Sequence, residues 1–211
     1  QAFLAAFEIL GNAGYFLNRG SLWRTDGSPA GTFRVKESFS AVSFLATPSR
    51  LLIRSLVAGA PQETRLWVSD GTLAGTLLVH SNRSVERLEA AGVELSGRLF
   101  FALSTSRYGQ EIWQTDGTLG GTDIFVDLET GTYGDGITSM AAGTTRAFFN
   151  HANGGFWSTD GTAGGTQAVT KAGVPVEAGV ATVLAVGDTG YSCGWAGLWR
   201  TDVTDAGTFQ V

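Results

Sequence analysis

The sequence is poor in the residues from which many functional sites are built. Among its 211 residues there are one cysteine and two histidines. The single cysteine, Cys193, excludes an internal disulfide framework, and we expect it to be a small buried hydrophobic residue. The histidines, His80 and His151, fall in no metal-binding or nucleophile motif. We therefore expect no metal site and no cofactor.

Charge is also sparse. Charged residues make up 16% of the sequence, the net charge is −5, and lysine and arginine form no cluster. Because nucleic-acid binding draws its affinity from concentrated positive charge, we expect no nucleic-acid partner. No segment approaches the ~20 apolar residues that span a bilayer, so we expect no membrane insertion. The sequence starts at Gln1 rather than methionine, which fits either a processed N-terminus or a piece of a longer protein.

Glycine, by contrast, is abundant, and much of it belongs to a segment that occurs five times. The first copy reads Leu22-Trp23-Arg24-Thr25-Asp26-Gly27-Ser28-Pro29-Ala30-Gly31-Thr32. Successive copies lie 42 to 46 residues apart, a period typical of propellers and solenoids. The tryptophans and aspartates of the copies are Trp23 and Asp26, Trp67 and Asp70, Trp113 and Asp116, Trp157 and Asp160, and Trp199 and Asp202.

Each copy lies in a unit whose hydrophobic pattern predicts four short strands. In the third unit these are residues 88–93, 99–103, 111–115 and 122–126, and in the second they are 42–47, 51–56, 65–69 and 76–80. Short turns between them predict an antiparallel meander. Segments rich in small residues, such as 140–143 and 184–187, suit the innermost strand, where sheets converge.

The sequence therefore predicts an all-β protein, a five-bladed β-propeller of four-stranded antiparallel blades. We expect one domain over residues 1–211, with blades at about 1–37, 38–81, 82–129, 130–172 and 173–211. The repeated tryptophans are expected to be buried between adjacent blades. A parallel β-helix is the competing architecture. Closure of the ring is expected to rest on packing between the first and last blades, unless the chain is part of a larger array.

The segment Asp-Gly-Thr-x-x-Gly-Thr joins the third and fourth strands of each unit, and its residue types are those of a turn. Aspartate accepts hydrogen bonds from backbone amides ahead of it, and glycine supplies positive φ. We expect Asp26, Asp70, Asp116 and Asp160 to act in this way. The alternative is a calcium loop, but one carboxylate per turn is too few for a cation cage.

The repeated segment resembles the signature of the bacterial ELWxxDGT repeat family, Glu-Leu-Trp-x-Ser/Thr-Asp-Gly-Thr-x-x-Gly-Thr. The resemblance covers all five units and implies an extracellular or cell-surface propeller, without implying an activity. Three positions depart from the signature: its first glutamate is present only as Glu111, Ser28 replaces threonine, and the fifth copy reads Asp202-Val203-Thr204-Asp205-Ala206. The last departure predicts a relaxed turn in the final blade. In blade count and length the chain also resembles five-bladed lectins of the tachylectin type.

Recognition is expected on loops that break the repeat. The loops between strands two and three, and between strand four and the next strand one, share a face in a propeller. Bulky polar and aromatic residues there suit a glycan or an extracellular protein. The candidate ligand-binding residues are Arg107, Tyr108, Glu111, Tyr133, His151, Asn153 and Trp195.

Two other functions compete with this binding module. A glycosidase needs paired carboxylates, and the inner strands offer only Glu8 and Glu89, with Glu94 nearby. We therefore expect no enzyme. A structural or self-associating domain of a surface or matrix protein is the remaining alternative.

Overall fold

A computed structural model describes residues 7–37, 39–58, 62–128, 136–152, 155–179 and 182–211. Over these residues the chain consists of strands and turns, without a helix. No helix that could span a membrane is therefore found in this part of the chain.

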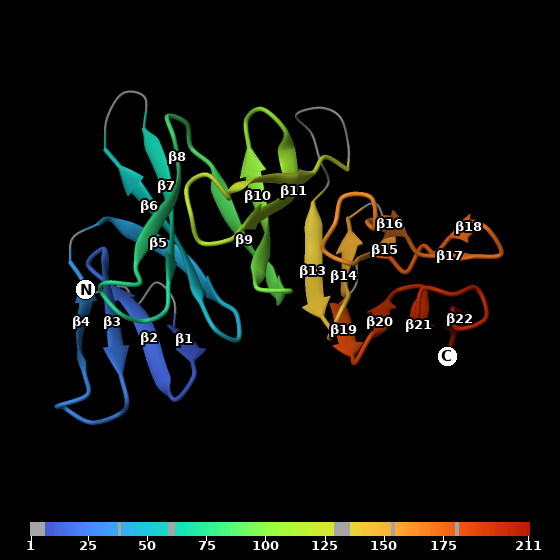
Figure 1. The fold of residues 1–211 in the computed structure, drawn as a ribbon, viewed down its shortest axis with the longest axis horizontal. Helices are drawn as coiled ribbons and strands as arrows, with labels where there is room; N and C mark the ends of the chain where they lie inside the picture. The colour runs from blue at the N-terminus through green and yellow to red at the C-terminus, as the bar shows by residue number, and fades with distance from the viewer. Residues whose placement is uncertain (1–6, 38, 59–61, 129–135, 153–154, 180–181) are drawn as a thin grey trace. The chain divides into compact units, whose positions relative to one another are not determined.

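The strands form five four-stranded antiparallel sheets and one two-stranded sheet among the described residues (Figure 1). The first two four-stranded sheets contain β1 (Phe7–Leu10), β2 (Ala13–Asn18), β3 (Ser21–Thr25) and β4 (Phe33–Lys36), then β5 (Ala41–Ala46), β6 (Leu51–Val57), β7 (Glu63–Ser69) and β8 (Leu77–Asn82). The third contains β9 (Arg87–Leu95), β10 (Arg98–Thr105), β11 (Gly109–Thr115) and β12 (Asp123–Val126). The fourth contains β13 (Ile137–Ala142), β14 (Ala147–His151), β15 (Phe156–Thr159) and β16 (Gln167–Ala168), and the fifth β19 (Thr182–Val186), β20 (Thr189–Gly194), β21 (Gly197–Thr201) and β22 (Phe209–Gln210).

Each four-stranded sheet corresponds to one sequence repeat, and we number the repeats 1 to 5 accordingly. The strands predicted for repeats 2 and 3 are all present, with bounds shifted by a few residues at most. Neighbouring strands are antiparallel in the pairs β1–β2, β2–β3 and β3–β4, and likewise in the sheets of repeats 2, 4 and 5. The parallel β-helix is therefore excluded. One element was not predicted, the hairpin of β17 (Thr170–Lys171) and β18 (Val174–Pro175) between repeats 4 and 5.

The chain divides into two compact units. The first comprises residues 1–90 and 115–123, and the second comprises 91–114 and 124–211. The boundary passes through the sheet of repeat 3: the start of β9 and the turn between β11 and β12 belong to the first unit, and the rest of its strands belong to the second.

In each unit the core lies between consecutive sheets, and the same two faces meet each time. In the first unit, Tyr15, Leu17 and Leu22 of repeat 1 pack against Ile53 and Trp67 of repeat 2. The face that carries the repeated tryptophan thus covers the opposite face of the preceding repeat. The pattern recurs in the second unit, between repeats 3 and 4 and between repeats 4 and 5.

The repeated tryptophans are less uniformly enclosed than expected. Trp113 is 7% exposed, whereas Trp23, Trp67, Trp157 and Trp199 are half-buried. Aromatic neighbours stack on several of them: Phe16 lies 6.1 Å from Trp23, and Phe149 lies 6.1 Å from Trp157, measured between ring centroids. Trp67, Trp157 and Trp199 pack against the cores between consecutive sheets rather than forming exposed stacking platforms.

Candidate functional site

The repeated turn is held by the same hydrogen bonds in every copy. In repeat 2, the Oδ1 atom of Asp70 accepts hydrogen bonds from the amide of Thr72, at 2.9 Å, and from its hydroxyl, at 2.7 Å. The Thr72 hydroxyl oxygen accepts from the amide of Gly75, and the Thr72 carbonyl accepts from the hydroxyl of Thr76. The corresponding aspartates, Asp26, Asp116, Asp160 and Asp202, accept bonds in the same way. The prediction that Asp26, Asp70, Asp116 and Asp160 accept backbone hydrogen bonds within their own turns is confirmed.

Two glycines of the motif are required for different reasons. Gly71 has a φ of +90°, a backbone conformation that side chains with a Cβ rarely adopt. At Gly75, an added Cβ would lie about 2.1 Å from the Asp70 carboxylate, which therefore needs the space above a bare backbone. The first glycine of the motif is thus required by the backbone conformation, and the second is required by the close approach of the carboxylate.

Hydrogen bonding also lowers the pKa of carboxylates in these turns. The hydroxyl of Thr72, and then its backbone amide, lower the pKa of Asp70 from its ordinary 3.8. The pKa values of Asp26, Asp160 and Asp202 are lowered by the equivalent hydroxyls and amides. The turns therefore present fixed negative charges at neutral pH.

The turn of repeat 5 was expected to be relaxed, and this prediction is wrong. Val203 takes the place of the first glycine, yet it keeps positive φ, at +69°, and Asp202 keeps its bonds to Thr204. The side chain of Val203 packs against the apolar cluster between repeats 4 and 5, which offsets the unfavourable backbone conformation.

The other unusual residue of this turn, Asp205, anchors the unpredicted hairpin. Its Oδ1 atom accepts a hydrogen bond from the amide of Ala172, and its carbonyl accepts one from the Lys171 ammonium at 2.7 Å. Ala172 has positive φ, so this contact stabilises a tight hairpin turn. Asp205, one of the residues by which the fifth motif departs from the signature, is thus the residue that contacts the hairpin of β17 and β18.

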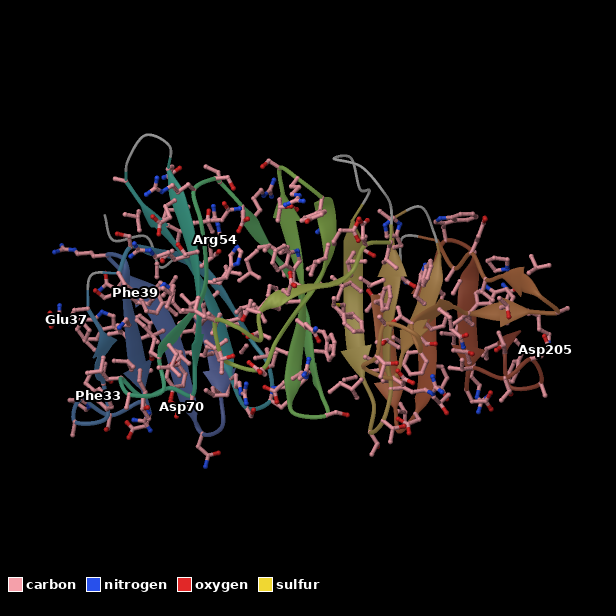
Figure 2. The ribbon with its side chains drawn as sticks, turned by 45° about the horizontal axis from the view of Figure 1, so that its top comes forward. Phe33, Glu37, Phe39, Arg54, Asp70 and Asp205 are labelled. Atoms are coloured by element: carbon pink, nitrogen blue, oxygen red, sulfur yellow. The ribbon has the colours of Figure 1, made fainter. Side chains whose placement is uncertain are left out.

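Among the described residues, a groove of about 350 Å³ lies in the first unit, on the side of the motif turns. Its walls are side chains of repeat 1, including Tyr15, Arg24 and Phe33, and the turn of repeat 2 from Asp70 to Leu73. The Arg24 guanidinium lies over the Phe33 ring, 5.5 Å from its centroid. Figure 2 shows Phe33 and Asp70 at the same end of the sheets, and Arg54 at the other. The groove was not predicted, because recognition was expected at the end where Arg54 lies.

The predicted ligand-binding residues divide into three groups. Two are buried: Glu111 is enclosed and its Oε2 accepts a hydrogen bond from the Leu128 amide at 2.8 Å, and His151 lies within the core of repeat 4. Both side chains are buried in the structure, and their assignment to a ligand site stays a prediction. Tyr133 and Asn153 lie outside the described residues.

The remaining three candidates are accessible. Arg107 is exposed and its guanidinium stacks 4.9 Å from the ring centroid of the half-buried Tyr108. Trp195 is 79% exposed. Its indole lies directly over the backbone of Gly179, where an added Cβ would be 2.3 Å from the indole nitrogen. Trp195 comes from the β20–β21 loop and Gly179 from the segment before β19, so the two predicted sets of loops meet here.

A hydrogen-bonded cluster around the buried Glu86, which follows β8, was missed. The Oε2 atom of Glu86 lies 2.8 Å from the Nε2 atom of His80, and its Oε1 accepts a hydrogen bond from the Asn82 amide group at 2.6 Å. Arg54 donates to the Glu86 carbonyl, and burial lowers the pKa of this guanidinium. The sequence did not predict this cluster, because the spacing of His80, Asn82 and Glu86 matches no motif. The cluster stabilises the connection between β8 and β9, which is not part of the repeated segment.

A second hollow bears on enzymatic activity. It measures about 470 Å³ and is lined by Glu8 with Phe7, Ile9, Ala46, Thr47 and Pro48. Burial raises the pKa of Glu8, as in a general acid. The other lining residues supply no second carboxylate, so the pair that glycoside hydrolysis requires is not assembled in this hollow.

Comparison with solved structures identifies the fold. The Neurospora crassa Pan2 WD40 domain matches 99% of this chain and 65% of its own, with 12% identity and a TM-score of 0.57. Puromycin hydrolase matches 99% of this chain and 37% of its own, at 13% identity and a TM-score of 0.58. The computationally designed Ika8 protein matches 96% of this chain and 59% of its own, at 13% identity and a TM-score of 0.55.

These likenesses establish an all-β architecture of the β-propeller type, built from four-stranded antiparallel sheets. The chain spans less than two thirds of the length of each solved structure named above. No family model and no curated protein matches the sequence.

Proposed function

We propose that the chain is a non-catalytic extracellular binding module of five propeller blades, which recognises a glycan or the surface of another extracellular protein. The five sheets, each with one Asp-containing turn, support a count of five blades. The resemblance of the repeat to the ELWxxDGT family supports a location outside the cell or at its surface. The residues that line the hollow of Glu8 include no second carboxylate, which supports a role without catalysis.

The exposed indole of Trp195 carries this proposal. Burial of an apolar ring lowers the free energy, so an indole that is 79% exposed favours a partner that would cover it. One side of the ring rests on Gly179, and the remainder faces solvent. An aromatic face supported by backbone is preorganised, so little conformational entropy is lost when a ligand stacks on it. The apolar face of a sugar ring, or an apolar side chain of a protein, matches this platform.

A glycan array with the purified chain, followed by titration with the sugar that binds best, tests the proposal. Trp195→Ala should weaken binding about fivefold or more, as expected for an aromatic anchor. Leu119→Ala, which removes an exposed apolar side chain from the motif turn of repeat 3, is the matched control and should leave affinity unchanged. The proposal would be contradicted if the Trp195→Ala variant bound with the affinity of the wild type. It would also be contradicted if the purified chain bound neither glycans nor extracellular proteins.

A further inference from the structure

The groove in the first unit contains an arginine, Arg24, that the packing of the repeats does not explain. It lies on β3 between its cross-strand neighbours Tyr15 on β2 and Phe33 on β4. The turn of repeat 2 forms the opposite wall, where a Cβ added to Gly71 would be 2.1 Å from the Tyr15 hydroxyl oxygen. Both walls of the groove therefore belong to the first unit.

The next pair of repeats shows that packing one repeat on another does not require this arginine. In repeat 2 the corresponding cross-strand neighbours are Leu52, Val68 and Leu77. Val68 and Leu77 line a smaller hollow of about 250 Å³ beside the turn of repeat 3. The position of Arg24 is thus filled by an apolar side chain where a repeat only has to receive the next turn, and Arg24 is available for a ligand.

The Arg24 guanidinium has donors left for an acceptor from outside the chain. It is half-buried, stacks 5.5 Å from the Phe33 ring centroid, and donates one long hydrogen bond of 3.4 Å to the Gly31 carbonyl. The equivalent Arg200 of repeat 5 lies 3.8 Å from the Asp202 carboxylate. Among the described residues, Arg24 has no ion pair of this kind. Since a guanidinium carries several N–H donors in a planar fork that fits a carboxylate, the groove favours a ligand with a carboxylate group.

The remaining walls of the groove suit a hydroxylated ring better than an extended peptide. Phe33 is 46% exposed, which leaves ring surface for the apolar face of a sugar. The bonds within the turn engage the Oδ1 atom of Asp70, so its Oδ2 atom can accept hydrogen bonds from hydroxyl groups. The amides of Gly71 and Thr72 donate within the turn, so this wall offers a peptide backbone few partners. The volume of about 350 Å³ lies within the range of about 300 to 1,000 Å³ of small-ligand pockets.

We propose that this groove binds a hexuronic acid residue of an acidic glycan, with the sugar carboxylate on Arg24, the ring on Phe33 and hydroxyl groups on Asp70. Arg24 and Asp70 lie on opposite walls, so the carboxylate and the hydroxyl groups of the sugar are received separately. The carboxylate is assigned to Arg24 rather than to Arg34, which also lines the groove, because the Arg34 guanidinium is paired with Glu37.

This inference goes beyond the proposed function, because it adds a binding site in the first unit and assigns an acidic ligand to it. Trp195, which carries the proposed function, belongs to the second unit, and the groove does not need it. The two proposals can therefore fail separately, provided that the experiment reports where a sugar binds.

Heteronuclear NMR spectra of the chain, titrated with galacturonate and with galactose, test the site. The two sugars differ in one group on the ring, a carboxylate in the first and a hydroxymethyl group in the second. Galacturonate should shift the side-chain N–H signal of Arg24 and the amide signals of Thr72 and Leu73. It should bind about tenfold more tightly than galactose, as expected for one hydrogen-bonded ion pair. The indole N–H signal of Trp195 reports on the other site.

A variant at Arg24 tests the carboxylate contact. Arg24→Met keeps a long side chain against Phe33 but removes the charge, so galacturonate should bind about tenfold more weakly and no more tightly than galactose. Arg200→Met is the matched control, because Arg200 stacks on Phe209 in the same way but is paired with Asp202. This control should leave the affinity for galacturonate unchanged.

A charge on the opposite wall gives a second test, which does not require the fold to tolerate a change at Arg24. Leu73 is 63% exposed, so Leu73→Glu should leave the fold intact, while its carboxylate repels galacturonate and weakens binding about tenfold. Leu119→Glu places the same charge at the same position of the turn of repeat 3, where Leu119 is 59% exposed. This variant should bind galacturonate as the wild type does.

Four outcomes would overturn the proposal. Galacturonate and galactose would bind equally well, or Arg24→Met and Arg200→Met would weaken binding equally, or Leu73→Glu and Leu119→Glu would do so. In the fourth outcome, galacturonate in large excess would shift no signal from the groove. If it then shifted the indole signal of Trp195, the proposed function would stand while the groove would not be the site.

Discussion

The side chain of Tyr15 lies over Gly71 so closely that a Cβ on this glycine would be 2.1 Å from the tyrosine hydroxyl oxygen. Gly71→Ala should therefore destabilise the chain by about 2 kcal/mol or more, from positive-φ strain together with overpacking against Tyr15. Gly27→Ala introduces the same strain without the clash and should cost less. Urea denaturation of the two variants measures the difference, and equal losses would show that the contact with Tyr15 does not constrain the turn.

The carboxylates with lowered pKa make stability depend on acid. The pKa of Asp188 is lowered by hydrogen bonds from the hydroxyl and amide of Thr145, and the pKa values of Asp26, Asp70, Asp160 and Asp202 are lowered similarly. A folded-state pKa below the ordinary 3.8 means that the stabilisation is complete above that pH and is lost as the pH falls through the folded value. We expect the urea midpoint to be level from neutral pH to about pH 5 and to fall below pH 4. Asp188→Asn should flatten the fall, and an unchanged acid dependence would contradict the assignment.

Two tryptophans of similar size should respond oppositely to truncation. Trp113 is buried in the sheet of repeat 3, so Trp113→Ala should cost about 3 to 5 kcal/mol. Trp195 is exposed, so Trp195→Ala should change stability by less than about 0.5 kcal/mol. Thermal unfolding of both variants provides the comparison. A large loss at Trp195 would mean that its contact with Gly179 holds the loop rather than presenting a platform.

The anchoring of the β17–β18 hairpin can be tested by proteolysis. Asp205→Ala removes the acceptor of the Ala172 amide and should weaken the hairpin by about 1 kcal/mol. Tryptic cleavage after Lys171 should then accelerate about fivefold, because the segment opens more often. Asp205→Asn keeps an acceptor oxygen and is the control. Unchanged cleavage would show that the hairpin is held by its other contacts.

The hydrogen-bonded cluster around Glu86 should be costly to disrupt. Glu86→Ala leaves His80 and Asn82 without their buried acceptor, and we expect a loss of about 3 kcal/mol in the free energy of unfolding. Ser81→Ala, at an exposed neighbouring hydroxyl, is the control and should cost much less. Chemical denaturation measures both variants, and a small effect at Glu86 would mean that water replaces the lost contacts.

The sequence predicted those parts of the molecule that depend on local chemistry. Alternating apolar residues fixed the strands of repeats 2 and 3, and the bonds of Asp70 follow from the turn chemistry of its motif. Predictions failed where they depended on a distant partner. Cys193 is exposed rather than buried. Burial of Cys193 depends on the packing around the last sheet, and the conformation of the fifth turn depends on the packing of Val203 against the cluster between repeats 4 and 5.

The hairpin and the groove were missed for related physical reasons. The strands of the hairpin contain two residues each, which is too short for a hydrophobic period to be visible. The groove combines Phe33 with the turn at Asp70, and their proximity follows only from the packing of one sheet on the next. Trp195 has no equivalent in the other repeats, so the sequence indicated that the fold does not need it in the core. The indole is indeed exposed.

The motif turns are self-contained, because the polar groups that fold each one lie between residue −1 and residue +6 around its aspartate. A repeat that is copied to another place in the chain therefore brings the hydrogen bonds of its own turn with it. What it must match in its neighbours are the apolar faces on either side and the polar contacts between repeats, such as the bonds from the Thr144 and Thr145 amides to Asp188. Residues that project beyond this frame, such as Trp195, are under neither requirement.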